Sequence, residues 1–198
     1  NIGDIMPSSL EKILETHTQV VENGLTLDGD FRYSRYAVST LRGGVGKSTL
    51  SFNLAFEISR KKSVLVADVC PQCNLTEMML RGENTAVTIY TALQPQLLGP
   101  AFGEQPDDIS YRVSEYCNSF KGGKRCYFVP GDAEMFAFPS TLYQQLQIAI
   151  AQGNSNAMKQ LLRSLRLILN DEAKSKQCEM VLMDTSPFYA GGTHLGWC

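Results

Sequence analysis

Short runs of apolar residues, separated by stretches with helical periodicity, dominate the pattern of hydrophobic and polar positions along this chain. Residues 63–68 and 180–184 are almost continuously apolar until a final aspartate, and residues 125–130 form a third run. Continuous rather than alternating hydrophobicity is typical of parallel strands that are buried on both faces. We therefore expect strands at these three places, and a further strand at residues 34–40.

Apolar residues at helical spacing lie before, between and after these runs. Residues 8–23 predict an amphipathic helix whose apolar stripe consists of Leu10, Ile13, Leu14, His17, Val20 and Val21. Further helices are expected up to about Arg60, over 140–151 and over 157–170, whereas the Gly- and Pro-rich residues 98–108 predict a loop. Strands that alternate with helices indicate an α/β fold with a doubly wound, mostly parallel sheet.

Composition narrows the class of protein. Of the 198 residues, 43% are hydrophobic and 19% are charged, as in ordinary soluble domains. With no apolar run of about 20 residues and no leader, we expect a cytoplasmic protein without a membrane segment. The net charge of −2 gives no general attraction to nucleic acid, and the basic clusters Arg60–Lys62 and Lys121–Arg125 are interpreted as solvated turns.

Residues 42–49 read Arg-Gly-Gly-Val-Gly-Lys-Ser-Thr and carry the strongest chemical signal in the chain. Glycines let backbone N–H groups face phosphate oxygens, and the helix that follows adds the partial positive charge of its N-terminus. Lys47 would reach the β- and γ-phosphates, and Ser48 would offer its hydroxyl to Mg²⁺. The alternative is a glycine-rich turn without a ligand. The predicted phosphate-binding residues are Gly43, Gly44, Val45, Gly46, Lys47, Ser48 and Thr49.

Two aspartates, Asp68 and Asp184, end apolar strand-like runs. In doubly wound sheets, ligands gather at the carboxyl ends of the strands, so both carboxylates are expected near Lys47. Carboxylates beside a phosphate loop can hold Mg²⁺, usually through water. The predicted metal ligands are therefore Ser48, Asp68 and Asp184, and the alternative for each aspartate is a helix cap.

Three segments in the same order resemble the ParA/Soj-type partition ATPases, relatives of MinD and the nitrogenase iron protein. The loop of that family, a deviant Walker A motif, reads Lys-Gly-Gly-Val-Gly-Lys-Thr, and here residues 42–48 match it. Its second segment, Asp-x-Asp-Pro-Gln-Gly-Asn-x-Thr, is similar to residues 68–76, and its third, Asp-x-Pro-Pro, to residues 184–187. The resemblance covers about residues 34–193.

This resemblance implies an ATP-binding switch that uses Mg²⁺, forms a homodimer on ATP and hydrolyses ATP slowly. Family members act in plasmid partition, chromosome segregation or cargo positioning, with DNA and a ParB-like stimulating protein as partners. The resemblance assigns catalytic roles to Lys47, to Asp68 and to Arg42, which stands where the family has a lysine that reaches the other subunit. It divides the chain into a tail and helix, residues 1–30, and a P-loop ATPase domain, residues 31–198.

The chain departs from the family pattern at two further places. Cys70 stands where the family has the aspartate that orients the attacking water, and a thiol is a poor substitute for that acceptor. We therefore expect weak or absent hydrolysis with binding retained. The sequence also stops at Cys198, soon after Asp184, whereas family members continue with further strands and helices. We expect it to be a fragment, or to be completed by another chain.

Other functions stay open at this point. A pseudo-ATPase that acts through a protein partner fits the cysteine at position 70. Cys70 and Cys73 form a Cys-x-x-Cys pair, which suits a thiol redox protein or half of a zinc site. A metabolic kinase or amidoligase is also compatible, because a phosphate loop selects the phosphate donor and leaves the acceptor undefined.

Overall fold

The computed structural model describes residues 9–23, 33–99, 103–187 and 191–197. The chain divides into two units, Asn1–Arg32 and Tyr33–Cys198. In the first unit, helix α1 spans Ser9–Asn23, over the residues predicted for the N-terminal helix, and the side chains of Leu14 and Val21 are exposed. Three members of the predicted apolar stripe have side chains outside the described part: Leu10, Ile13 and Val20.

The second unit is built on one five-stranded sheet with the order β1-β5-β2-β4-β3. Four strands run parallel: β1 (Arg35–Val38), β2 (Val64–Asp68), β4 (Cys126–Val129) and β5 (Met180–Asp184). The two-residue strand β3 (Tyr111–Arg112) pairs antiparallel with β4 at one edge, and β1 forms the other edge. The predicted doubly wound, mostly parallel sheet is confirmed.

The predicted strands lie where the apolar runs are longest. Every residue of β2 and β5 is buried, as expected for strands covered on both faces. Strand β1 is shorter than the predicted residues 34–40 and alternates exposed with half-buried positions, because it lies at the edge of the sheet. Asp68 and Asp184 are therefore the last residues of two fully buried strands, β2 and β5.

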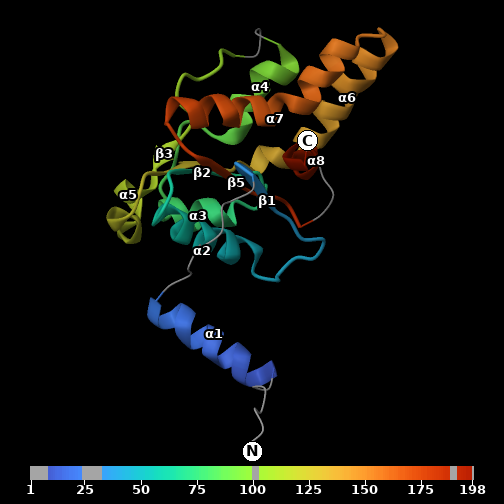
Figure 1. Ribbon diagram of the computed structural model, residues 1–198. Helices are drawn as coiled ribbons and strands as arrows, with labels where there is room; N and C mark the ends of the chain where they lie inside the picture. The colour runs from blue at the N-terminus through green and yellow to red at the C-terminus, as the bar shows by residue number, and fades with distance from the viewer. Residues whose placement is uncertain (1–8, 24–32, 100–102, 188–190, 198) are drawn as a thin grey trace, which may run out of the picture. The chain divides into compact units, whose positions relative to one another are not determined.

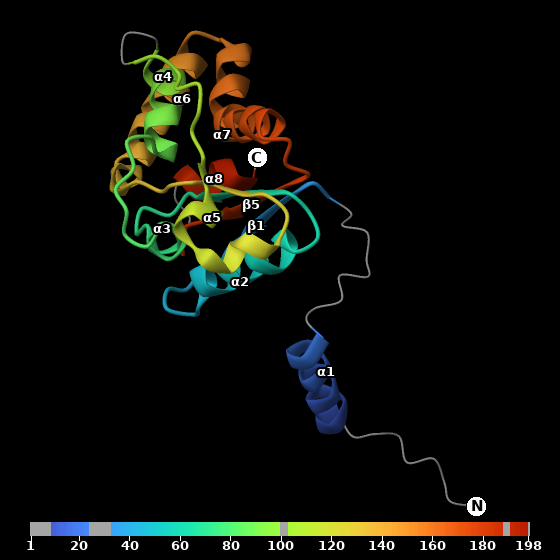
Figure 2. The same ribbon diagram turned by 90° about the vertical axis from the view of Figure 1, so that its left-hand side faces the viewer.

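Helices cover both faces of the sheet (Figures 1 and 2). On one face lie α2 (Lys47–Ser59) and α3 (Asn74–Leu80). The other face carries α4 (Ile89–Leu98), α6 (Phe138–Ala151), α7 (Ser155–Ser175) and α8 (Gly191–Trp197). Short turns complete the fold: α5 (Val113–Tyr116) and the 3-10 helices η2 (Asn118–Gly122) and η3 (Ala133–Phe136). None of the described helices has the length and apolar character to cross a membrane.

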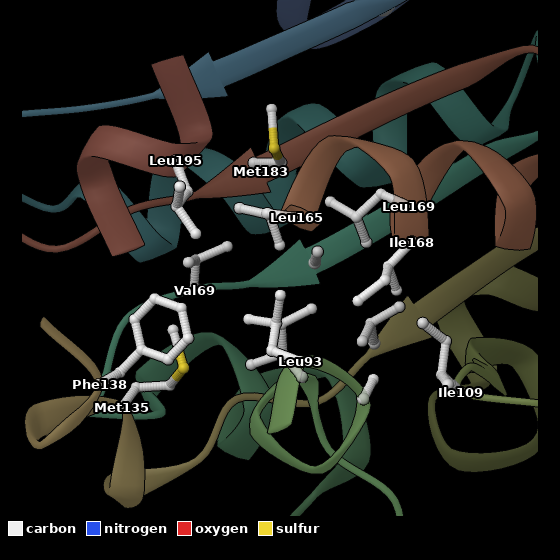
Figure 3. Packing of buried hydrophobic residues seen from close by; sticks show 14 of the residues in the cluster. Val69, Leu93, Ile109, Met135, Phe138, Leu165, Ile168, Leu169, Met183 and Leu195 are labelled. Carbon is white, nitrogen blue, oxygen red and sulfur yellow. The ribbon is translucent and has the colours of Figure 1, made fainter. Parts of the chain in front are cut away.

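A large hydrophobic core fills the space between the sheet and the layer of α4, α6 and α7 (Figure 3). Leu93 of α4, Phe138 of α6 and Leu165 of α7 are nearly or completely buried there, facing Met183 of β5. Burial of side chains of this size stabilises a fold by about 1.5–3 kcal/mol each. This core therefore holds β5, and with it Asp184, in a fixed position.

Several helices differ from the sequence prediction. Helix α7 is longer than the predicted residues 157–170, because the Asn154 side chain accepts a hydrogen bond from the Ala157 N–H and caps its start. Helices α3 and α4 were not predicted. Helix α4 contains Pro95, a residue that usually breaks a helix, but it begins with a capping box between Thr88 and Thr91. Of the predicted loop 98–108, residues 100–102 lie outside the described part.

The turn after α2 lies directly against the turn before β4. The Lys124 backbone N–H donates to the Ser59 carbonyl (2.5 Å), and the Val64 N–H donates to the Arg125 carbonyl (3.0 Å). A Cβ atom on Gly123 would lie 2.6 Å from the Ser59 carbonyl oxygen. Only glycine lets these two turns approach so closely.

Gly123→Ala should therefore destabilise the domain, by about 1–3 kcal/mol, because backbone has to move to relieve the overlap. Urea denaturation would measure the change in the free energy of unfolding. Gly122→Ala is the matched control, because a Cβ atom there has no neighbour within 4 Å. Equal midpoints for the two variants would contradict the steric argument.

Candidate functional site

The predicted phosphate loop connects the end of β1 to the first turn of α2. Gly44 and Gly46 have φ values of 73° and 82°, in the left-handed region that residues with a side chain rarely adopt. Nothing lies within 4 Å of a Cβ atom built on either glycine, so the space in front of this backbone is open. The N-terminus of α2 follows at Lys47, so its partial positive charge faces the same space.

A cavity of about 270 Å³ lies over this loop. All of the predicted phosphate-binding residues line it, together with Arg42. The segment after β2 forms part of its wall, through Cys70, Gln72, Asn74 and Met78, and Thr40 and Pro187 complete the lining. The structure thus brings residues of all three matched segments, far apart in sequence, to one cavity. Three of the lining residues were not predicted from the sequence: Gln72, Asn74 and Met78.

A buried ion pair lies at the base of the loop. Lys47 Nζ is 2.6 Å from Asp184 Oδ1, and the two side chains are 7% and 0% exposed. The Ser48 hydroxyl donates to Asp184 Oδ2 (2.8 Å), and the Ser51 hydroxyl donates to Oδ1 (2.7 Å). Asp184 therefore joins the loop to β5, and both oxygens are hydrogen-bonded. Ser51 was not predicted as a site residue, although it lies one helical turn after Lys47.

Asp68 lies next to Asp184, because the two residues are register partners on β2 and β5. Its carboxylate accepts hydrogen bonds from the Cys70 N–H (3.0 Å), the Thr76 N–H (3.0 Å) and the Thr76 hydroxyl (2.9 Å). Burial, and then the charge of Asp184, raise the pKa of Asp68 to about 6. Thr76 is in the first turn of α3, so Asp68 caps that helix. Asp68 also lies beside Asp184, which contacts Lys47 of the phosphate loop.

The donor atoms at the base of the loop suit Mg²⁺. Ser48 and Asp184 present hydroxyl and carboxylate oxygens, the hard ligands that magnesium prefers while keeping several waters. Asp68, one strand away, is completely buried and does not line the cavity, so its predicted role as a metal ligand stays a prediction. Within the described residues, no group of three or more His, Cys, Asp or Glu side chains could hold a metal by itself. A metal here would need water or phosphate among its ligands.

Arg42 and Thr49 line the cavity, and both are exposed. The Arg42 carbonyl accepts a hydrogen bond from the Thr40 hydroxyl (3.0 Å), which fixes the backbone at the start of the loop. The role of the Arg42 guanidinium in a second subunit stays a prediction.

Cys70 and Cys73 are free thiols. Burial raises the pKa of Cys70, which is 2% exposed, and raises that of Cys73 to about 12. Reactive thiols in redox proteins have a lowered pKa, so these environments oppose the thiol redox hypothesis. At the cavity wall, Cys70 presents a neutral thiol where the resemblance expects a carboxylate.

Solved structures similar to this one share its α/β fold. Protein DIP2308 from Corynebacterium diphtheriae superimposes with a TM-score of 0.66 and 20% identity, covering 83% of this chain and 56% of that protein. Cobyrinic acid a,c-diamide synthase from Mycobacterium smegmatis, with bound ADP and magnesium, gives 0.58 and 19%, covering 82% and 54%. A putative plasmid partition protein from Borrelia burgdorferi, bound to AMPPNP, gives 0.54 and 17%, covering 83% and 58%.

The chain spans just over half the length of these structural relatives. No curated protein sequence matches it. A family model, the CobQ/CobB/MinD/ParA nucleotide binding domain, matches residues 36–186, from β1 to just beyond β5. This range contains the phosphate loop, both aspartates and every residue that lines the cavity except Pro187. The chain belongs to the CobQ/CobB/MinD/ParA nucleotide-binding domain family.

Proposed function

We propose that this domain binds Mg-ATP at residues 42–49 and acts as a nucleotide-dependent, dimerising switch of the ParA type. The observation that carries the proposal is the buried Lys47–Asp184 pair with the Ser48 hydroxyl, beneath an open loop of glycines. A cation, a carboxylate and a hydroxyl at the base of such a loop are the groups that bind a nucleoside triphosphate and its magnesium ion. The relatives with ADP and magnesium, or with AMPPNP, support the same ligand class.

Each residue has a distinct part in the proposed site. The backbone N–H groups of the loop and the N-terminus of α2 hold the phosphates, and Lys47 supplies the opposing charge. Ser48 and Asp184 offer oxygen ligands to Mg²⁺, and Asp68 acts through water. Bound Mg-ATP supplies the phosphoryl group and the signal that favours the dimer. Arg42, at the exposed side of the loop, is the residue proposed to contact the nucleotide of a second subunit.

Lys47→Ala should weaken Mg-ATP binding by about 100-fold, because the charge-assisted contacts to the phosphates are lost. Isothermal titration calorimetry measures the affinity, and light scattering on the same samples records the oligomeric state. Lys61→Ala is the control, since Lys61 is exposed in the turn after α2 and outside the cavity lining. The parent should form dimers only with Mg-ATP. A parent chain that fails to bind Mg-ATP would refute the proposal.

One observation favours a second candidate, a pseudo-ATPase that binds nucleotide without turnover. Cys70 stands on the cavity wall with a raised pKa, so it is a neutral thiol and a poor acceptor for an attacking water. Both candidates predict Mg-ATP binding, and only measured turnover separates them. Partition of DNA, a ParB-like partner and cargo positioning rest on the resemblance to the ParA branch and are proposed with it.

A further inference from the structure

Ser51 lies in α2, one helical turn after Lys47, and is completely buried. Its hydroxyl oxygen lies 2.7 Å from Asp184 Oδ1 and 3.1 Å from the Lys47 carbonyl oxygen. A hydroxyl has a single hydrogen to donate, and hydrogen bonds to a carboxylate are shorter and stronger than those to a neutral carbonyl. The Ser51 hydrogen therefore points to Asp184, which makes this serine part of the cluster below the phosphate loop.

Among the described residues, one turn of α2 supplies every side-chain hydrogen bond to Asp184. Lys47 Nζ (2.6 Å) and Ser51 Oγ (2.7 Å) both donate to Oδ1, and Ser48 Oγ (2.8 Å) donates to Oδ2. An oxygen of an ionised carboxylate accepts about two hydrogen bonds, so the lysine and the buried serine fully occupy Oδ1. Two donors on Oδ1 hold the carboxylate in one orientation, with Oδ2 directed at Ser48.

Ser51 cannot touch a ligand in the cavity over the loop. Neither Ser51 nor Asp184 is among the residues that line this cavity, and both are completely buried. Lys47 and Ser48 do line the cavity, and both are bonded to Asp184. Any effect of Ser51 on a bound ligand must therefore pass through the Asp184 carboxylate to these two loop residues.

We propose that Ser51 is a positioning residue for magnesium at this site, an inference that rests on the proposed function. Because the Ser48 hydrogen is donated to Asp184 Oδ2, the lone pairs of the Ser48 oxygen remain available to Mg²⁺. Ser51 fixes the carboxylate that accepts this hydrogen, and it can keep Oδ1 occupied when Lys47 contributes its charge to bound phosphates. Hydrogen bonds that orient a metal ligand in this way change metal affinity by about 10–100-fold.

Ser59 provides a matched comparison in the same helix. It is 1% exposed, and its hydroxyl donates to the Phe56 carbonyl (2.7 Å) within α2. Ser59→Ala and Ser51→Ala each remove one buried serine hydroxyl together with its hydrogen bond. Of the two hydroxyls, only that of Ser51 is bonded to Asp184, so only its loss should reach the proposed magnesium site.

Binding of the fluorescent analogue mant-ATP to the full chain, measured by anisotropy with saturating Mg²⁺ and again with EDTA, tests the proposal. In Ser51→Ala, the affinity with Mg²⁺ should fall by about tenfold, because the Ser48 hydroxyl is no longer held in place. The affinity with EDTA should stay within about twofold of the parent's, since Lys47 and the loop N–H groups still hold the phosphates. Ser59→Ala should leave both affinities unchanged. Urea denaturation of the nucleotide-free variants, with similar midpoints for the two, checks that both are folded.

The ratio of the two affinities separates positioning from a purely structural role. If Ser51 only stabilised α2, Ser51→Ala would weaken mant-ATP binding equally with Mg²⁺ and with EDTA, or leave both affinities unchanged. Either result, or the same Mg²⁺-specific loss in Ser59→Ala, would overturn the inference and leave the proposed function intact. A parent chain that binds no mant-ATP in the presence of Mg²⁺ would refute the proposed function itself, and the inference with it.

Discussion

Asp184→Ala should destabilise the domain by about 3–5 kcal/mol, because it leaves the Lys47 ammonium buried without its carboxylate partner. The hydroxyls of Ser48 and Ser51 lose their acceptor in the same step. Urea denaturation followed by circular dichroism measures the change in the free energy of unfolding. Mg²⁺-dependent nucleotide binding should disappear with it, since a proposed magnesium ligand is removed.

Two controls separate the buried charge from a general loss of stability. Asp171→Ala removes an exposed carboxylate that lies 3.7 Å from Lys174, and it should cost less than about 0.5 kcal/mol. The double variant Lys47→Met, Asp184→Leu removes both buried charges, so it should be more stable than Asp184→Ala alone. If the double variant were the less stable of the two, the uncompensated charge would not be the cause.

Cys70→Asp should raise the rate of ATP hydrolysis at least tenfold, because it restores a carboxylate that can orient the attacking water. General-base and water-positioning groups contribute about 10²–10⁴-fold to rates of this kind. Cys70 lines the cavity beside the phosphate loop, so a carboxylate there faces the proposed nucleotide. Steady-state phosphate release at saturating Mg-ATP measures the effect.

Cys70→Ser is the control for this substitution, because it removes the thiol without adding a carboxylate, and it should leave the rate unchanged. The gain from aspartate should be larger at pH 8 than at pH 6.5. Burial is the largest cause that raises the pKa of the group at residue 70, and the charges of Asp68 and Asp184 add to it, whereas Lys47 lowers it. A new carboxyl group there should therefore also have a raised pKa. An unchanged rate in Cys70→Asp at both pH values would show that this residue does not limit turnover.

The strands and the sheet class were predictable because their signal is local. The apolar runs that end in Asp68 and Asp184 match β2 and β5 and are buried throughout. Helix α4 was not predictable in this way, since Pro95 suggests a break and the helix is stabilised instead by its Thr88 cap and by burial of Leu93. Strand β3 has only two residues and depends on its pairing with β4.

The candidate site was predictable to the extent that its residues stand in one loop or at strand ends. The carboxyl ends of parallel strands meet at one edge of the sheet, so the sequence predicted that Asp184 lies near the loop. The structure has Asp184 in contact with Lys47 and Ser48. Ser51 could not be assigned from the sequence, because a serine in a helix can have many structural roles. Its hydrogen bond to Asp184 also joins residues that are 133 positions apart. The contact between the turn after α2 and the turn before β4 was also not predictable, because it depends on the pairing of β2 with β4 and on Gly123.

The edge position of β1 has a consequence for the order of events during synthesis. Among the described strands, β1 pairs only with β5, and the Thr185 hydroxyl donates to the Val38 carbonyl across 147 positions of sequence. At ribosomal speeds of ~5–20 residues per second, about 7–30 s separate the appearance of these two partners. During that interval the glycine loop is already made but has no strand to anchor it. A nascent chain should therefore acquire the proposed phosphate site only after β5 has left the ribosome.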